Sequence, residues 1–218
     1  MNQLHLDYLV SPEWAKRLET DLLPWIERVA ELGDDVLEIG PGPGLTTDII
    51  RQRTMHVTAV DIDDDLAAAL TTRMAGTNVD VVHGDATRLD LPSDRFTAAT
   101  CFNMLHHVPS PEEQDRVLTE ILRVLRPGAA LFATDARDTE LLRAVHDDDT
   151  FVPLSADTIV DRLHGLGYGD VDLEVTEYEM RFAARKGGIT RMSVAPTEVD
   201  ATLVSPADAT VRDCLHLV

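Results

Sequence analysis

Short apolar runs alternate with helical patterns through the middle of the chain. In the helical stretches, leucine, isoleucine and valine recur every three or four residues, most clearly over residues 112–125, which predicts helices with one buried face. The runs between them predict strands at residues 36–39, 56–60, 79–82, 96–101 and 129–134. Strands that alternate with helices predict an α/β fold, in which a doubly wound, mostly parallel sheet carries helices on both faces.

The pattern changes after the fifth predicted strand. A helix is expected over residues 155–164, followed by strands at 170–179 and 180–184 that are joined so closely that they must be antiparallel. Periodicity is lost after Gly187. We therefore divide the chain into an N-terminal helical cap (1–34), a central α/β domain (35–187) and a C-terminal extension (188–218). The composition of the extension suits a flexible tail, an edge strand or a homodimer contact.

The N-terminal cap is expected to contain two helices. Ser11 and Pro12 form a helix start, since a hydroxyl caps the first turn and proline fits the first helical position. Pro24 is expected to end this helix before Trp25 opens the next helical face. The aromatic residues Tyr8, Trp14 and Trp25 either pack on the sheet or cover a binding pocket.

The composition excludes several classes of protein. The 218 residues include 19 Lys and Arg against 39 Asp and Glu, a net charge of −20, and 44% are hydrophobic. Such a chain can bury a core, but it lacks the basic surface that binds nucleic acid or anionic lipid. The acidity fits either an ordinary solvated surface or adaptation to high salt.

The location follows from other features of the sequence. No apolar run reaches the length of about 18 residues that spans a membrane, and the N-terminus does not have the pattern of a leader peptide. The two cysteines are too few for a disulfide framework, so we expect a cytoplasmic protein without membrane insertion. Cys101 lies in an apolar strand and is expected to be a core residue.

A glycine-rich turn follows the first predicted strand. Gly40, Gly42 and Gly44 stand between that strand and a helix, where a bare backbone lets a ligand approach and the helix amides can face an anion. The dinucleotide pattern requires Gly or Ala three residues after Gly42, but Leu45 stands there. Glu38 is a carboxylate inside the strand. If it is buried, it requires a cationic partner, such as an ammonium group of a ligand.

Polar residues also follow the next three strands. A carboxylate at Asp61 can accept hydrogen bonds from both hydroxyls of a ribose, although Asp61 would also suit the cap of the following helix. Asp85 can accept from the amine of a purine, or from backbone amides in a turn. Asn103 follows the fourth strand. In an open parallel sheet these carboxyl ends meet at one edge, where ligands bind.

The ordered set of segments resembles the class I S-adenosylmethionine (SAM)-dependent methyltransferases, in particular the small ubiquinone/menaquinone-biosynthesis-like group. The segments are 38–44, Asp61, 84–86 and 125–128, and the resemblance covers about residues 35–185. It implies a Rossmann-like sheet of seven strands whose last strand is antiparallel. It also implies that SAM is bound by Glu38, Gly40, Pro41, Gly42, Gly44, Asp61, Ile62, Asp85, Ala86, Phe102 and Asn103.

The resemblance gives each of these positions a role. The glycine loop would wrap the methionine and ribose of SAM, with Glu38 supporting the loop and the amino group. Asp61 would hold the ribose hydroxyls, and Ile62 would pack on the adenine. Asp85 would meet the adenine amine with Ala86 beside it. Phe102 and Asn103 would line the methionine end and face the acceptor.

The resemblance implies transfer of a methyl group to O, N or C of a small molecule, with release of S-adenosylhomocysteine (SAH). Because the sulfonium already activates the methyl group, alignment and exclusion of water supply much of the catalysis and a base is optional. His106 and His107 are the candidate bases, and packing or hydrogen bonding at a loop is the alternative for each. Two other functions remain open: a SAM- or SAH-binding protein without turnover, and an NAD(P)-dependent oxidoreductase.

No metal site is expected. The run at residues 146–149, His-Asp-Asp-Asp, has ligand side chains, but adjacent residues seldom share one ion and the run equally fits a solvated loop. The expected partner is a small-molecule methyl acceptor and no nucleic acid, and a homodimer is left open.

Overall fold

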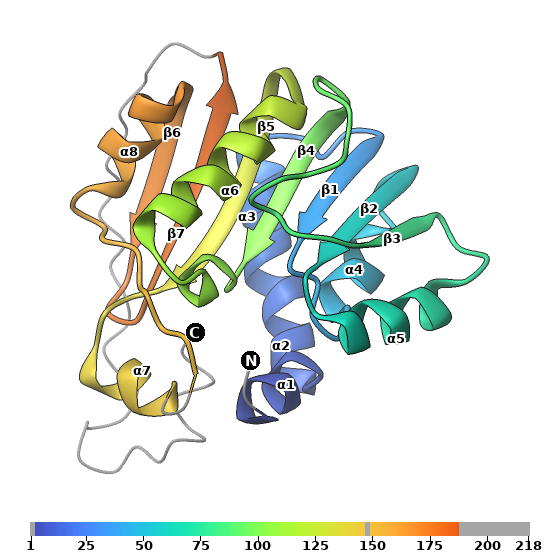
Figure 1. Cartoon of the computed structure of the whole chain (residues 1–218), viewed down its shortest axis with the longest axis horizontal. Coiled ribbons are helices and arrows are strands. Elements are labelled where there is room, and N and C mark those ends of the chain that lie inside the picture. The colour runs from blue at the N-terminus through green and yellow to red at the C-terminus, as the bar shows by residue number, and fades with distance from the viewer. Residues whose placement is uncertain (1–2, 147–148, 188–218) are drawn as a thin grey trace.

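A single mixed sheet forms the centre of the computed structural model, which describes residues 3–146 and 149–187. Within these residues seven strands pair in the order β3-β2-β1-β4-β5-β7-β6 (Figure 1). All pairs are parallel except those of β7, which is antiparallel to both β5 and β6. The strands are β1 (Asp35–Ile39), β2 (His56–Asp61), β3 (Val79–His83), β4 (Phe96–Phe102), β5 (Leu125–Ala136), β6 (Tyr168–Val175) and β7 (Glu179–Lys186). The predicted fold class is confirmed.

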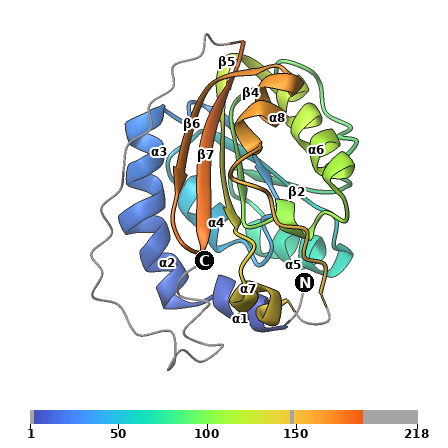
Figure 2. The same cartoon turned by 90° about the vertical axis from the view of Figure 1, so that its left-hand side faces the viewer.

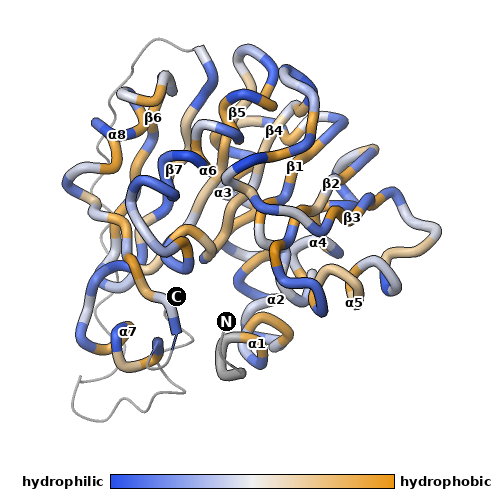
Figure 3. Tube along the Cα trace, in the orientation of Figure 1, coloured by the Kyte–Doolittle hydropathy of each residue, from blue (hydrophilic) through white to orange (hydrophobic). Residues whose placement is uncertain are grey.

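Helices cover both faces of the sheet because successive strand residues point to opposite sides. Leu37 of β1 packs in one apolar cluster with α6 and α8, whereas its neighbour Val36 packs in a second cluster with α2, α3, α4 and α5. Figure 2 shows α6 and α8 on one side of the sheet, with α2 and α3 on the other. In Figure 3 the central strands carry orange, apolar stretches. The helices of these layers are α2 (Pro12–Arg17), α3 (Leu23–Val29), α4 (Leu45–Ile50), α5 (Asp64–Met74), α6 (Pro111–Val124) and α8 (Ile159–Leu166).

The two helices expected on either side of Pro24 form one continuous helical segment, and α1 (Gln3–Leu9) is a separate helix before it. Ser11 caps α2 by accepting a hydrogen bond from the Trp14 amide, as predicted. The expectation that Pro24 interrupts the helix is wrong, because the π-helical turn η1 (Leu18–Leu22) connects α2 directly to α3. The Leu23 amide donates to the Leu18 carbonyl, five residues back. This wider turn relieves the clash and the missing donor that a proline imposes on a regular α-helix.

Several element boundaries also differ from the sequence pattern. The last two strands are joined by a turn at residues 176–178, where the Thr176 amide donates to the Glu179 carbonyl, so β6 ends earlier than expected. The helix expected from residue 155 begins at Ile159. Residues 188–218 lie outside the described part of the chain, and the predicted three-part division therefore stays a prediction. Among the described residues, no helix is both long enough and apolar enough to cross a membrane.

Three short helical elements lie at the edge where the parallel strands end. They are α1 (Gln3–Leu9), the 3-10 turn η2 (Leu105–His107) and α7 (Glu140–Val145). In Figure 1 both α1 and α7 lie below the sheet, at the edge toward which β1 and β4 point. Elements from the N-terminal part and from two internal segments of the described chain thus border the carboxyl ends of the central strands.

Candidate functional site

A cavity of about 420 Å³ opens at the carboxyl ends of β1, β2, β3 and β4. Most of the residues predicted from the sequence line it, although they come from separate strand ends. They are Glu38, Gly40, Pro41, Asp61, Ile62, Asp85, Ala86, Phe102, Asn103 and His107. Three predicted residues, Gly42, Gly44 and His106, are outside the lining.

The glycine turn requires glycine for reasons that the structure makes explicit. Gly40 has a φ of +67°, and a Cβ there would lie 2.4 Å from the Cγ atom of Met104, which fills the space behind the turn. Gly42 does not line the cavity, but its amide donates a hydrogen bond of 3.1 Å to Oδ2 of Asp61. The turn is therefore tied to the end of β2, so Gly42 supports the cavity wall rather than forming it.

Asp61 is buried at the end of β2, with 7% of its surface exposed. Its Oδ1 accepts from the Asp63 amide at 2.9 Å and its Oδ2 from the Gly42 amide. Burial raises the pKa of the Asp61 carboxyl, while these two backbone hydrogen bonds oppose that change. The helix cap of α5 is Asp63, which accepts from the Asp65 and Leu66 amides, so Asp61 itself does not cap the helix. An ionised carboxylate has about four acceptor positions, so two remain for a ligand.

Glu38 is a buried carboxylate with one hydrogen bond among the described residues. The Thr47 hydroxyl donates to its Oε2 at 2.7 Å. Burial raises the pKa of the Glu38 carboxyl to about 7, and the nearby Asp61 adds to that rise. Because Glu38 also lines the cavity, a cationic group of a ligand placed there would stabilise its ionised form.

Asp85 and Ile62 lie at the rim of the cavity. Oδ1 of Asp85 accepts from both the amide and the hydroxyl of Thr87, and these bonds lower the pKa of the Asp85 carboxyl. Asp85 thus accepts a backbone amide in a turn, which was the alternative given by the sequence. Contact of Asp85 with an adenine stays a prediction. Ile62 is 69% exposed, which leaves an apolar surface for a ligand ring.

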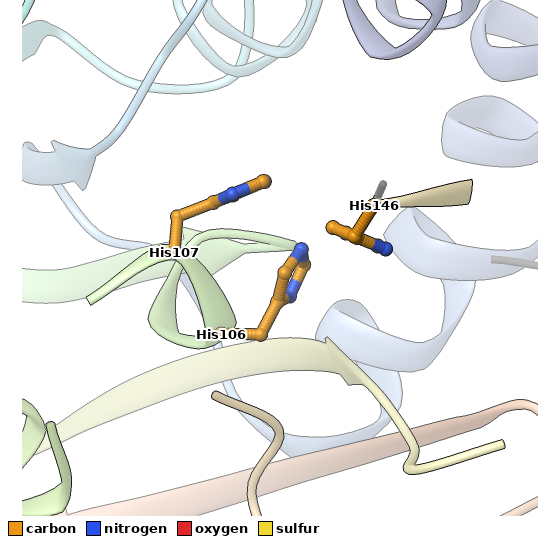
Figure 4. Close-up of side chains that lie close together, drawn as sticks. All are labelled: His106, His107 and His146. Carbon is orange, nitrogen blue, oxygen red and sulfur yellow. The ribbon is translucent and has the colours of Figure 1, made fainter. Parts of the chain in front are cut away.

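The two candidate bases occupy different environments. His107 lines the cavity, and its Nδ1 lies 3.2 Å from the Thr150 carbonyl oxygen. His106 is 2% exposed, and its Nδ1 lies 2.6 Å from Oδ1 of the fully buried Asp135. His107 is therefore the histidine that can meet a ligand in the cavity, whereas His106 is buried behind the lining. Figure 4 shows both residues close to a third histidine, His146.

The sequence analysis missed part of this site. Trp14 lines the cavity together with Leu9 of α1, whereas Trp25 does not line it. The position of Trp14 agrees with the covering role considered for the N-terminal aromatic residues. Asp135 was not singled out, although it follows an apolar strand in the same way as Asp61 and Asp85. That shared position at a strand end was the available signal.

Comparisons with known proteins agree on one domain. The family model described as "Methyltransferase domain" matches residues 37–133. The ubiquinone biosynthesis O-methyltransferase of Pseudomonas entomophila is 32% identical over 113 residues, which cover 50% of this chain and 47% of that protein. A probable ribosomal RNA small subunit methyltransferase A of Methanothermobacter thermautotrophicus is 41% identical over 78 residues, covering 36% of this chain and 28% of that protein. The chain thus spans about half the length, or less, of the curated relatives it matches.

A solved structure shows the same fold. The phosphoethanolamine N-methyltransferase 2 of Haemonchus contortus, in complex with phosphomonomethylethanolamine and S-adenosylhomocysteine, superposes with a TM-score of 0.66. Its sequence identity is 14%, and the match covers 84% of this chain and 60% of that chain. At this identity the likeness concerns the arrangement of the elements.

Proposed function

Because the family model described as "Methyltransferase domain" matches residues 37–133, we propose that the chain is a class I, SAM-dependent methyltransferase that transfers a methyl group from SAM to a small molecule and releases SAH. The methyl acceptor atom is O, N or C. One observation carries the proposal: Glu38, Gly40, Asp61 and Asp85 come from three strand ends and line a single cavity at the edge where such sheets bind ligands.

The residues of the cavity fit the parts of SAM. Glu38 offers a buried carboxylate to the cationic amino group of the methionine moiety. Asp61 has acceptor positions left for the two ribose hydroxyls, while its bonds to the Gly42 and Asp63 amides fix its orientation. Ile62 and Asp85 would contact the adenine ring and its amine. Phe102 and Asn103 would line the methionine end of the cofactor.

The chemistry needs little more than alignment. SAM supplies an activated methyl group, and the acceptor atom displaces the thioether sulfur in line. The apolar side chains of Leu9, Trp14 and Met104 in the wall limit the access of water to that step. Where the acceptor must lose a proton, His107 would be the candidate base, and its position in the cavity lining supports this role.

The charge of the chain favours a small acceptor over a nucleic acid. The net charge of −20 opposes docking of a nucleic acid backbone, although one of the relatives described above is named a ribosomal RNA methyltransferase. A cytoplasmic location and a homodimer stay predictions from the sequence. Binding without turnover and NAD(P) chemistry are outcomes of the test that follows.

Calorimetric titration of the purified protein tests the proposal. We expect SAH and SAM to bind and NAD and NADP to give no heat, at both low and high salt. Release of SAH with an acceptor from a panel of hydroxyl, amine and activated-carbon compounds would then separate a methyltransferase from a binding protein. A folded protein that binds neither SAM nor SAH at either salt concentration contradicts the proposal.

The affinity for SAH is expected to depend on pH through Glu38. With a pKa of about 7, the ionised fraction of Glu38 rises from about one tenth at pH 6 to about nine tenths at pH 8. The cationic amino group of SAH favours the ionised form, so the association constant should rise about tenfold over this range and level off above it. Titration calorimetry across the range measures this.

The matched variant for this prediction is Glu38→Gln, which keeps the size of the side chain but cannot ionise. It should bind SAH more weakly at pH 8 and with an affinity that does not change between pH 6 and pH 8. A wild-type affinity that is flat or falls with rising pH would show that Glu38 does not face the amino group.

A further inference from the structure

Three histidines converge beside the cavity. His106 and His107 belong to η2, and His146 follows the end of α7. One ring nitrogen of each lies within 4.8 Å of one ring nitrogen of the other two. Figure 4 shows the three imidazoles lying close together. His106 and His146 are buried, and His107 lines the cavity.

The hydrogen bonds of the three rings have one feature in common. In each ring Nδ1 lies close to an oxygen that can only accept: Oδ1 of Asp135 at 2.6 Å from His106, the Thr150 carbonyl at 3.2 Å from His107, and the Leu142 carbonyl at 2.6 Å from His146. A neutral imidazole carries one N–H, so these contacts place the proton on Nδ1 and leave the lone pair on Nε2. Histidines that bind metals are oriented in this way, with the second nitrogen bonded to a carboxylate or a carbonyl.

A second observation points to a cation at the same place. Asp135 is fully buried, and within the described residues its Oδ2 has no hydrogen-bond partner. A buried carboxylate with one hydrogen bond needs positive charge nearby. The Asp149 carboxylate also lies near the cluster, with its Oδ2 3.8 Å from Nδ1 of His107. The surroundings of the three imidazoles are therefore negative, which favours a bound cation.

We propose that His106, His107 and His146 bind a divalent transition metal ion through their Nε2 atoms. Three imidazoles and an open position match Zn²⁺ and its neighbours, whereas Mg²⁺ and Ca²⁺ take oxygen ligands. Ligand nitrogens around a tetrahedral Zn²⁺ lie about 3.3 Å apart, so binding draws the rings closer together. The sequence analysis predicted no metal because it considered only the run at residues 146–149, of which His146 alone belongs to this cluster.

The open position would serve the acceptor. Because His107 lines the cavity, an oxygen of the acceptor can reach the ion from there. With its Nε2 on the ion, His107 would be a ligand rather than the base, and the ion would lower the pKa of the acceptor hydroxyl so that its proton is lost to solvent. This role rests on the proposed methyltransferase function and selects acceptors with an ionisable hydroxyl group. Metal binding itself does not depend on that function.

Titration of untagged full-length protein with Co²⁺, after dialysis against a chelator, tests the site. We expect one ion per chain, visible absorption bands of a tetrahedral Co²⁺ site, and displacement of these bands by Zn²⁺. His146→Ala should weaken Co²⁺ binding by at least about 100-fold, and Asp135→Asn by about 10- to 100-fold through the orientation of His106. The control is His83→Ala, which removes a half-exposed histidine on β3 and should leave Co²⁺ binding unchanged.

SAH binding measured on the same samples separates the two proposals. Wild-type protein that binds SAH but no Co²⁺ or Zn²⁺ overturns the metal site and leaves the methyltransferase function standing. Protein that binds Co²⁺ but no SAH supports the metal site and contradicts the proposed methyltransferase function. If His146→Ala fails to fold, His107→Ala provides the test at a less buried position, and Co²⁺ binding equal to that of wild type in a folded His107→Ala protein contradicts the proposal.

Discussion

Asp61→Ala is expected to reduce the affinity for SAH by more than a hundredfold. The substitution removes two hydrogen bonds from ribose hydroxyls to a charged acceptor, each of which contributes about 1.5–3 kcal/mol when buried. Their sum is about 3 kcal/mol or more, and every 1.4 kcal/mol is about a tenfold change in affinity. The same carboxylate holds the Gly42 amide, so its removal also loosens the glycine turn. Titration calorimetry with SAH measures the loss directly.

The control variant for Asp61→Ala has to remove one negative charge from the same region of the protein. Asp65→Ala does this, because Asp65 lies exposed in the first turn of α5 and does not line the cavity. Its affinity for SAH should stay within about twofold of wild type, since surface charges contribute little. Equal affinities of folded Asp61→Ala and Asp65→Ala proteins would mean that the ribose assignment is wrong.

Trp25→Ala is expected to reduce the free energy of unfolding by about 3–5 kcal/mol, the usual cost of truncating a buried aromatic residue. Trp25 is 2% exposed, and its ring meets that of Phe132 in β5 edge-on, with centroids 5.6 Å apart. The Arg181 guanidinium of β7 lies 5.3 Å from the centroid on the same ring. Denaturation with urea, followed by circular dichroism, measures the change.

This second prediction tests the division of the chain at residue 34. Because Trp25 shares an apolar cluster with strands of the sheet, we infer that the N-terminal helices are part of the central domain. Val10→Ala is the control, since Val10 is 59% exposed and its truncation should change stability by less than about 0.5 kcal/mol. If Trp25→Ala costs less than about 1 kcal/mol, the N-terminal segment is separable from the central domain, and the inference that it belongs to that domain is wrong.

Features encoded by neighbouring residues could be predicted from the sequence. The alternation of apolar runs and helical faces determined the parallel sheet, and the glycine turn at Gly40 marked the end of its first strand. Asp61 and Asp85 were then placed at the cavity because parallel strands bring their carboxyl ends to one edge, whatever the details of packing. These rules need only local periodicity and chain direction, so they hold before any side chain is placed.

Contacts between distant residues were decided only by the tertiary structure. Two features depend on how the N-terminal helices pack against the sheet. One is the π-helical turn that lets the helix continue past Pro24, and the other is the position of Trp14 in the cavity wall. The pairing of His106 with Asp135, 29 residues away, depends on how the turn after β4 packs against the end of β5, and the approach of His146 depends on the segment after β5. Such contacts leave no periodic pattern or short spacing in the sequence, because they arise from strand register and close packing. The sequence by itself therefore determined the fold and the strand ends that line the cavity. Packing between distant segments decided the apolar wall of the cavity and the histidine cluster.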